Sequence, residues 1–594
     1  MGREDASGRP RRPADFPPRW VASLLKTLFA CVHYALVALL AYGAYTVGMR
    51  ASQMLAAGQL LPALQAALQR PVPLPAAVST AQAAATVGAV ALAGALLGWL
   101  LVWRRRSPTY LLDFECYRPE DKHKVTYSRF ITGSRDSGFF DEEAMDFQER
   151  ILLKSGLSEE TFFPPGLHLD PPEFDMNWAR SEAELVMFKA VDDLLRKTGL
   201  HPRQIDVLVT NCSLFCPTPS LAAMIINHFN MRSNCEAFNL GGMGCSAGIL
   251  AVDLAQKLLR ELGRGGYALV VSTENITQNW YHGNERSMLI PNTIFRMGSA
   301  AILLTNKRSE ARRSKYQLEH LVRVHLGADD TAYKCVFQRP DDRGFIGVEL
   351  SKDLVGVASK AMETNMTRLG PLVLPWSEKL MFAANWVARK VLRLRVPRFI
   401  PDFREAFNHF CLHAGGRGVV EGLSKQLKLT PAQMAPSANT LHWYGNTSSS
   451  TVWYSFGFVE SVQGVRRGDV VWQIGFGSGF KCNSVVWRAL RPIKEMHKSW
   501  EHIVGREDQA LQTLARIAAE TAAERQQKQQ QQQQQENGHA NGHVNGHANG
   551  HAKPVGDAVA TISRATAKKV EEQQDSVTTN GRALRSGKVV AYAG

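Results

Sequence analysis

One pattern of strand, glycine turn and helix occurs twice between residues 108 and 488, and it restricts the fold more than any other feature. In its first copy, a strand over 235–240 leads into the turn 241–244, then a helix over 246–262 and a strand over 267–273. Short β-branched strands alternate with amphipathic helices through the whole region, which is typical of a layered α/β fold. The sequence therefore predicts two related α/β halves.

The second copy of the pattern is longer. A strand end at 410–413 precedes Gly415-Gly416, Asn446 opens a Ser/Thr-rich helix start, and 469–475 is again a strand. This repetition places Cys245 and Asn446 at equivalent helix N-termini. Such ends carry unpaired N–H groups and a partial positive charge, which favour a thiolate and a developing oxyanion. We therefore predict a reactive thiol at Cys245, against the alternative of a buried structural cysteine.

A third helix is well marked in the first half. It begins at Ser181, whose capping box is completed by Glu184, and it stops at Gly199. A strand over 205–210 is predicted to follow it.

Two apolar runs precede the α/β region. They cover residues 28–49 and 83–103, and each is long enough to cross a hydrocarbon core of roughly 30 Å as a helix. Arginines crowd the chain before the first run, and three more, 104–106, follow the second. The positive-inside rule then puts both ends in the cytosol. We predict that residues 1–107 form a two-helix transmembrane hairpin, and not a cleaved signal peptide followed by a core helix.

The end of the chain has low complexity. Hydrophobic periodicity decays after about residue 487, and a glutamine tract at 526–535 is followed by four Asn-Gly-His units ending at His539, His543, His547 and His551. Histidines four residues apart would share one helical face and could bind metal, but Asn-Gly opposes a helix. Residues 491–594 are therefore predicted to be a mostly disordered tail.

Charge and cysteine content narrow the function classes. A net charge of +15 suits nucleic acid, an anionic membrane or an anionic substrate. Zinc-finger spacing, RNP-like motifs and long basic runs are missing from the sequence, which disfavours nucleic acid. The nine cysteines are odd in number and scattered, which favours a reducing compartment over a disulfide framework. Cys212 and Cys216 lack a second pair nearby, so a metal site is not expected.

Three strings point to a family. They are 239–248 around Cys245, 409–417 around His413 and 442–450 around Asn446. A Cys, His, Asn order also belongs to papain-like proteases, but their Cys-Gly-Ser-Cys-Trp context is missing here. The strings closely resemble the plant-type 3-ketoacyl-CoA synthases, the condensing enzymes of very-long-chain fatty acid elongation. The resemblance covers roughly residues 28–488.

The resemblance implies a thiolase-like fold, with two related halves in an α-β-α-β-α arrangement and an N-terminal membrane hairpin. We expect the N-terminal half at 108–395 and the C-terminal half at 396–490. It also implies a multi-pass protein of the endoplasmic reticulum membrane that binds acyl-CoA, malonyl-CoA and membrane lipid. A homodimer is expected, together with the ketoacyl-CoA reductase, hydroxyacyl-CoA dehydratase and enoyl-CoA reductase of an elongase complex. Neither a cofactor nor a metal is implied.

Roles for individual residues follow from the same resemblance. Cys245 would hold the acyl chain as a thioester, while His413 and Asn446 would stabilise the enolate formed from malonyl-CoA. Backbone N–H groups of Cys245 and of the turn at Gly477 and Ser478 would form the oxyanion hole. Supporting positions are implied for three other histidines: His325, His409 and His442.

Some readings stay open. Cys216 and the pair Trp443-Tyr444 depart from the family pattern, which puts substrate preference in doubt. The stretch 381–398 mixes apolar and basic residues and suits CoA phosphates, a membrane-surface helix or a solvated face. A polyketide-synthase-like enzyme and a catalytically dispensable scaffold of an elongase complex are the rival functions.

Overall fold

The computed structural model describes residues 92, 94, 108–263, 265–397 and 399–542. Almost all of the two apolar runs lies outside these residues. No helix within the described ranges is both long and apolar enough to cross a membrane. The transmembrane hairpin therefore stays a prediction.

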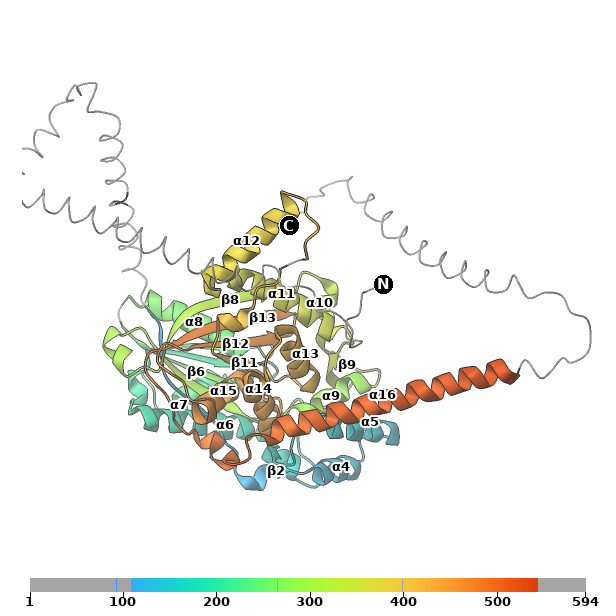
Figure 1. The fold of residues 1–594 in the computed structure, drawn as a ribbon. Coiled ribbons are helices and arrows are strands. Elements are labelled where there is room, and N and C mark those ends of the chain that lie inside the picture. The colour runs from blue at the N-terminus through green and yellow to red at the C-terminus, as the bar shows by residue number, and fades with distance from the viewer. Residues whose placement is uncertain (1–91, 93, 95–107, 264, 398, 543–594) are drawn as a thin grey trace, which may run out of the picture. The chain divides into compact units, whose positions relative to one another are not determined.

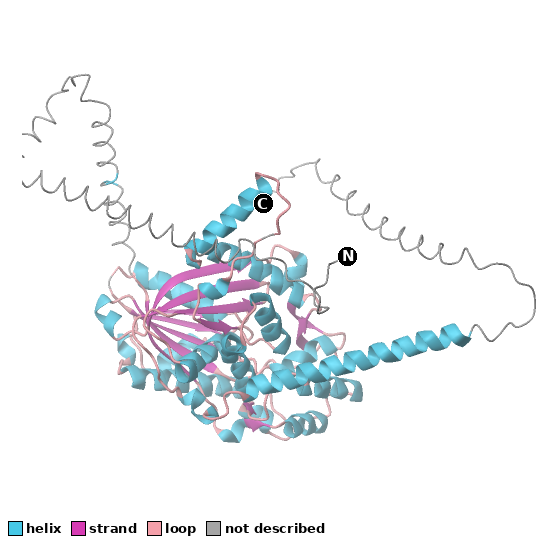
Figure 2. Cartoon of the chain, viewed as in Figure 1, coloured by secondary structure: helices cyan, strands magenta, loops and turns pink. Residues whose placement is uncertain are grey.

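In residues 108–542, leaving out 264 and 398, nine strands form one mixed sheet that fans through the middle of the body (Figures 1 and 2). The first half of the sheet contains, in spatial order, β1 (Tyr110–Cys116), β7 (Ser299–Thr305), β6 (Tyr267–Thr273), β4 (Val207–Asn211) and β5 (Glu236–Leu240). β4 runs parallel to β5 and β6, whereas β7 is antiparallel to β6 and β1.

The second half of the sheet repeats this pattern. Its strands, outward from β1, are β8 (Tyr316–His325), β13 (Lys481–Ala489), β12 (Val470–Gly477) and β11 (His409–Leu412). β11 is parallel to β12, and β13 is antiparallel to both β12 and β8. In that order they match β1, β7, β6 and β4 of the first half, which confirms the two related halves.

Two details of the predicted repeat are corrected. β11 corresponds to β4 by its pairing with the next strand, and not to β5 as the sequence comparison of the two copies implied. The halves divide between β7 and β8, because β8 pairs along its length with β13. This division comes earlier in the chain than residue 395. Only two residue pairs, one at Tyr110 and one at Leu111, join β1 to β8.

Helices complete five layers. α8 (Ala247–Glu261) packs on β4, β6 and β13, and α15 (Thr451–Phe458) packs on β1, β11 and β12, so both lie between the two halves of the sheet. α6 (Met176–Thr198) and α7 (Leu221–His228) cover the outer face of the first half. α11 (Leu354–Val373) covers the second half against β8 and β13. This is the predicted α-β-α-β-α arrangement.

The remaining elements surround these layers. Two small hairpins pair β2 (Lys124–Val125) with β3 (Thr161–Phe162), and β9 (Val336–Pro340) with β10 (Ile346–Leu350). The other α-helices are α4 (Tyr127–Asp136), α5 (Glu142–Leu153), α9 (Arg286–Ile294), α10 (Asp330–Lys334), α12 (Trp376–Lys390), α13 (Arg417–Leu427), α14 (Pro431–Tyr444) and α16 (Gln509–Gly542).

The start of α6 was predicted five residues too late. Its N-cap is Asp175, whose carboxylate accepts hydrogen bonds from the backbone N–H groups of Asn177 and Trp178 at 2.8 and 2.9 Å. A carboxylate at the N-cap satisfies the otherwise unpaired N–H groups of the first turn. The end was predicted correctly, since Gly199 caps the helix at φ 67°.

The predicted disordered tail is wrong over its first part. Residues 491–517 belong to the same compact unit as the sheet, and Trp500, Ile503 and Leu514 are buried there. α16 begins at Gln509 and continues through the glutamine tract to Gly542, which includes the first Asn-Gly-His unit. Glutamine, alanine and glutamate are good helix formers, and here they outweigh the glycine.

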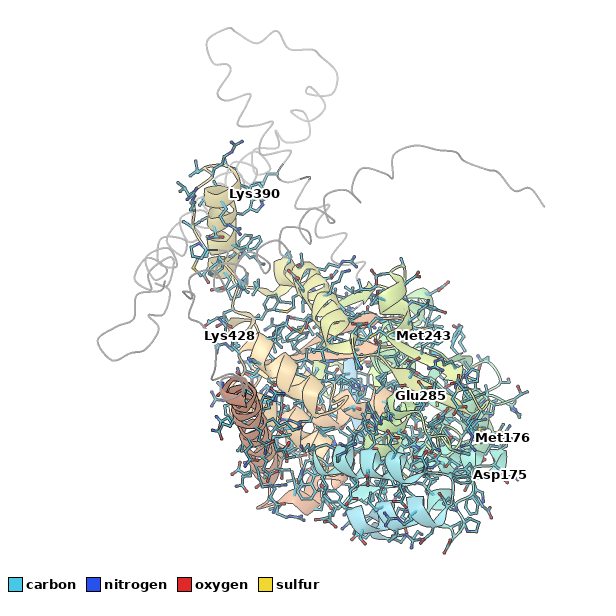
Figure 3. All side chains as sticks on the ribbon, turned by 90° about the vertical axis from the view of Figure 1, so that its right-hand side faces the viewer. Asp175, Met176, Met243, Glu285, Lys390 and Lys428 are labelled. Atoms are coloured by element: carbon cyan, nitrogen blue, oxygen red, sulfur yellow. The ribbon has the colours of Figure 1, made fainter. Side chains whose placement is uncertain are left out.

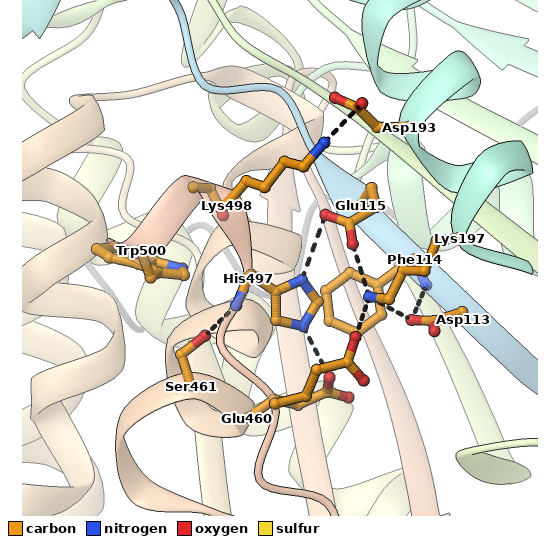
Figure 4. A network of polar contacts seen from close by, with 12 residues as sticks. Asp113, Phe114, Glu115, Asp193, Lys197, Glu460, Ser461, His497, Lys498 and Trp500 are labelled. Atoms are coloured by element: carbon orange, nitrogen blue, oxygen red, sulfur yellow. Dashed lines mark hydrogen bonds and ion pairs between the residues drawn. The ribbon is translucent and has the colours of Figure 1, made fainter. Parts of the chain in front are cut away.

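A buried ionic network explains why the tail residues are part of the core (Figure 4). It joins the middle and end of β1, the residue before β8, the π-helix η7 (Val459–Gln463) and the tail, through Asp113, Glu115, Lys315, Glu460, Glu495 and His497. The Lys315 ammonium lies 2.7 Å from Glu460, and the His497 Nε2 lies 2.7 Å from the same carboxylate. Without the tail, these buried charges lose two of their partners.

Candidate active site

The predicted catalytic residues line one cavity. This cavity has a volume of about 380 Å³ and lies where the two halves of the sheet meet. Cys245, His413 and Asn446 border it, together with Gly477 and Ser478. Segments separated by more than two hundred residues thus contribute to a single site.

Most of the remaining wall is apolar. It is formed by the β9–β10 hairpin, the first half of α11 and one face of α13, through Val336, Val348, Leu350, Leu354, Val355, Ala358, Val419 and Leu423. A concave, apolar cavity with a few converging polar groups is the usual form of a small-molecule site. The polar groups lie around Cys245, so the site has a reactive end and an apolar wall.

Two glycine turns, one from each half, hold Cys245 in place. Gly244 precedes it at φ +70°, and a Cβ added to Gly244 would lie 2.8 Å from the Cα of Gly477. A Cβ added to Gly477 would in turn lie 2.7 Å from the Oγ of Ser246, the N-cap of α8. The turns therefore touch backbone to backbone. This contact brings the N–H of Ser478 beside Gly244, the residue before Cys245.

The Cys245 thiol is protonated at neutral pH. Burial raises its pKa to about 12; a hydrogen bond from Ser448 lowers the pKa, and the neighbouring Glu274 carboxylate raises it. The helix N-terminus alone was expected to favour a thiolate, but burial outweighs it here. A proton acceptor is therefore needed when the sulfur attacks a substrate.

His413 is a neutral imidazole that lines the same cavity as Cys245. It directly follows β11, and its backbone N–H donates to Ile474 on β12 at 2.9 Å. Burial lowers the pKa of its ring to about 4. Its Nδ1 is buried and makes no hydrogen bond with the described residues. A neutral ring of this kind accepts a proton or donates a hydrogen bond to a bound carbonyl.

Asn446 is fixed through both its backbone and its amide. Its backbone N–H donates to Ile294 O at 3.0 Å, and its carbonyl accepts from Arg296 N at 3.0 Å. The side-chain Oδ1 accepts from Ser448 N at 2.8 Å, and Nδ2 donates to Gly415 O at 3.1 Å. The oxygen is thereby occupied, which leaves the second Nδ2 hydrogen as the group offered to a ligand.

Glu274 is a site residue that the sequence did not reveal. It directly follows β6, lines the cavity and is only 4% exposed. Burial raises the pKa of its carboxyl. The carboxylate accepts from Ser448 Oγ at 2.9 Å, Leu214 N at 3.0 Å and Cys212 Sγ at 3.2 Å. It therefore links the loop after β4 to the segment that carries Asn446.

The three supporting histidines do not border this cavity. His325 Nδ1 accepts from Gly327 N at 3.0 Å. His409 contacts Gln463 and Asp469 at 3.1 and 3.2 Å through its two ring nitrogens, and His442 Nδ1 contacts Gly156 O at 3.0 Å. Each ring therefore holds a neighbouring segment of the fold.

Family models match both halves of the chain. Residues 101–391 match the FAE1/Type III polyketide synthase-like protein model, and residues 404–489 match the C-terminal model of 3-oxoacyl-[acyl-carrier-protein] synthase III. Solved structures agree on the fold: the type III polyketide synthase domain of Steely1 from Dictyostelium is 17% identical, with a TM-score of 0.52, over 64% of this chain and 99% of that one. The family models, together with this fold, place the chain among the condensing enzymes of the FAE1/type III polyketide synthase-like class.

Curated relatives narrow this class. The chain is 53% identical to 3-ketoacyl-CoA synthase 4 of Arabidopsis thaliana over 68% of its own length and 78% of that protein. It is 52% identical to 3-ketoacyl-CoA synthase 17 of the same plant, over 68% of this chain and 83% of that one. The chain belongs to the 3-ketoacyl-CoA synthase family.

Proposed function

We propose that the chain condenses a long-chain acyl-CoA with malonyl-CoA, giving a 3-ketoacyl-CoA two carbons longer, CoA and CO₂. The observation that carries this proposal is the shared cavity of Cys245, His413 and Asn446, with an apolar wall beside the thiol. An acyltransferase of this kind needs a nucleophile, hydrogen bonds for an enolate and space for an alkyl chain. The reaction is the first step of fatty acid elongation.

The first half-reaction loads the acyl chain onto the enzyme. The Cys245 sulfur attacks the thioester carbonyl while the neutral His413 ring takes the thiol proton. The backbone N–H groups of Cys245 and Ser478 stabilise the tetrahedral oxyanion. The carbon–sulfur bond to CoA then breaks, CoA leaves with a proton, and the acyl chain lies along the apolar wall.

The second half-reaction forms the carbon–carbon bond. The thioester carbonyl of malonyl-CoA accepts hydrogen bonds from His413 and from the Nδ2 of Asn446, so the enolate left after loss of CO₂ is stabilised. The enolate carbon attacks the acyl carbonyl, and the bond to the Cys245 sulfur breaks. The departing Cys245 thiolate takes up a proton from solvent, which regenerates the free thiol.

The setting of this reaction is part of the proposal. The runs at 28–49 and 83–103 anchor the enzyme in the endoplasmic reticulum membrane with both termini in the cytosol, beside the reductases and dehydratase of an elongase.

A homodimer is supported by β5, which ends the described sheet and exposes Phe238. An uncovered edge strand of this kind is normally paired or protected. Phe238→Lys is expected to give a monomer by size-exclusion chromatography with light scattering.

The experiment supplies microsomes containing the full chain with labelled malonyl-CoA and a panel of saturated and unsaturated acyl-CoAs, with products identified by mass. A single two-carbon extension is expected. Cys245→Ala is expected to lower the rate by at least about a thousandfold and to abolish the acyl adduct on the protein.

Two results would favour the rival functions. Several successive condensations, ending in a cyclised or longer polyketide, would indicate a polyketide-synthase-like enzyme. Full elongation with Cys245→Ala would indicate a scaffold, since the nucleophile would then be dispensable.

A further inference from the structure

Large apolar side chains gather on the outside of one segment. Nineteen such side chains are exposed in the described residues, and ten of them lie between 372 and 400. Trp376 and Trp386 on α12 are 61% and 53% exposed, and Ile400 is 74% exposed. Single exposed apolar residues are ordinary, but a contiguous group of this size marks a contact surface. We call α12 and residues 391–397, 399 and 400 the α12 surface.

One face of α12 contacts the following chain segment, so the opposite face is the exposed one. Asn385 holds the returning chain, because its Nδ2 donates to Pro397 O at 2.9 Å and its Oδ1 accepts from Phe399 N at 3.0 Å. Glu378 accepts from Asp402 N at 3.0 Å on the same face. Trp376, Leu380 and Val387 follow a helical spacing on the opposite face, where they are exposed.

The α12 surface is also strongly basic. Residues 376–400 contain one acidic side chain, the buried Glu378, against six basic ones: Lys379, Arg389, Lys390, Arg393, Arg395 and Arg398. Figure 3 shows α12 standing out from the body, with Lys390 near its far end. Tryptophan and leucine with a cationic border are the composition of helices that lie in a bilayer interface. Anionic headgroups complement that border.

The position of α12 in the fold also favours a contact with a bilayer. A cavity of about 660 Å³ is bordered by Pro108, Thr109 and Tyr110 on one side and by Leu372 and Val373, at the end of α11, on another. The described body therefore begins close to the start of α12. Residues 1–107, which carry both apolar runs, join the body at this place. Arg260 and Arg308 line the same cavity and add positive charge there, whereas Arg488 in its lining pairs with Glu319.

We propose that the α12 surface is a second membrane contact, with its tryptophan and leucine side chains inserted at the headgroup level of an anionic bilayer. This contact goes beyond the condensing reaction and beyond the N-terminal anchor. It orients the body, because α11 extends from the α12 surface to the apolar wall of the cavity through Leu354 and Val355. A chain dissolved in the bilayer is thereby delivered near the cavity.

The test uses the full chain in vesicles of phosphatidylcholine with phosphatidylserine, in which some lipids carry bromine atoms near the upper part of their acyl chains. Because the chain has twelve tryptophans, the signal is the fluorescence of wild type minus that of Trp376→Phe/Trp386→Phe. We expect the brominated lipid to quench this difference by roughly half or more. An unquenched difference would overturn the proposal.

A second experiment tests the contribution of positive charge to the lipid contact. Arg393→Gln/Arg395→Gln is expected to remove the extra quenching that phosphatidylserine produces, because two cations leave the interface. Arg203→Gln/Arg343→Gln, which neutralises two exposed arginines elsewhere, is expected to behave as wild type. Quenching that is equal in both double variants would contradict a contact with anionic lipid.

Discussion

Glu274 and Ser448 act in opposite directions on the Cys245 thiol. The serine hydroxyl stabilises the thiolate by a hydrogen bond, and the carboxylate of Glu274 destabilises it by charge repulsion. The same hydroxyl also donates a hydrogen bond to the Glu274 carboxylate, so the thiolate and the carboxylate compete for its single proton. Two side chains that take no part in the proposed bond-forming steps thus modify the effect of burial, which is the largest cause of the raised pKa of Cys245.

This pairing predicts opposite shifts in two variants. Glu274→Gln is expected to lower the pKa of the Cys245 thiol, and Ser448→Ala is expected to raise it, each by about one pH unit. The measurement is the pH dependence of Cys245 alkylation by iodoacetamide, followed by mass spectrometry. Glu149→Gln, an exposed control, should leave the profile unchanged. Shifts of the same sign in both variants would contradict the pairing.

The buried ionic network predicts a defined pH window of stability. Burial would raise the pKa of Glu460 and of Glu115, but their cationic partners hold each at about 2, below the unfolded value of 4.5. Their contribution is complete above pH 4.5 and lost as the pH falls toward 2. Burial would lower the pKa of His497, but Glu115 and Glu460 raise it above 6.5. Its contribution is complete below pH 6.5 and lost as the pH rises through the raised value.

Urea unfolding from pH 3 to pH 9 tests this window. Stability should be greatest between about pH 4.5 and 6.5, and His497→Gln should flatten the decline on the alkaline side. Glu460→Gln should cost about 3 kcal/mol, because it removes one of the two carboxylates that lie 2.7 Å from the buried Lys315 ammonium. An alkaline decline that persists unchanged in His497→Gln would show that this imidazole is not its source.

Sequence reasoning could predict three candidate catalytic residues because glycines and short strings surround them. Cys245, His413 and Asn446 each sit in such a string, and the structure brings all three to one cavity. Glu274 has no such local signal, since its partner Ser448 lies 174 residues away. Only the folded chain shows that this carboxylate is buried. A contact between residues that far apart in the sequence cannot be recognised from one sequence alone.

Helices and strands were predicted well where hydrophobic periodicity was regular. β6 has the predicted bounds 267–273, and α8 differs by one residue at each end. α6 shows the limit, because a capping-box pattern at Ser181 occurs inside the helix while the true cap is Asp175. Residues 491–508 contain a 3-10 helix and loops, which have no period to detect although they are packed into the core.

The two interlocking turns provide a matched pair of glycine variants. Gly242 and Gly244 both have positive φ, but a Cβ at Gly242 meets nothing within 4 Å, whereas one at Gly244 clashes with Gly477. Gly242→Ala should therefore cost only backbone strain of about 1 kcal/mol. Gly244→Ala should cost about 3 kcal/mol and lower the condensation rate by about a hundredfold. Thermal unfolding and product formation measure the two effects.

An equal loss of unfolding free energy in Gly242→Ala and Gly244→Ala would show that both variants suffer only backbone strain. The contact between the turns would then contribute little to the placement of Cys245.

The whole chain divides at a place that truncation can test. The compact unit that holds the site ends at Ile517, and it includes the buried Trp500, Ile503 and Leu514. A chain ending at Arg525 is expected to keep its melting temperature within about 4 °C and to remain active. A chain ending at Leu490 lacks Glu495 and His497 of the ionic network and is expected to be insoluble or inactive. Activity of the shorter chain would contradict the assignment of these residues to the core.

Contact between Gly244 and Gly477 has a consequence for how such proteins diversify. Here the main chains of the two halves touch, so neither turn can gain a side chain unless the backbone of the other turn moves away. The wall formed by α11 and α13, by contrast, presents side chains that can be exchanged one at a time. Evolution is therefore free to resize the space for the alkyl tail while the position of the reacting sulfur stays the same.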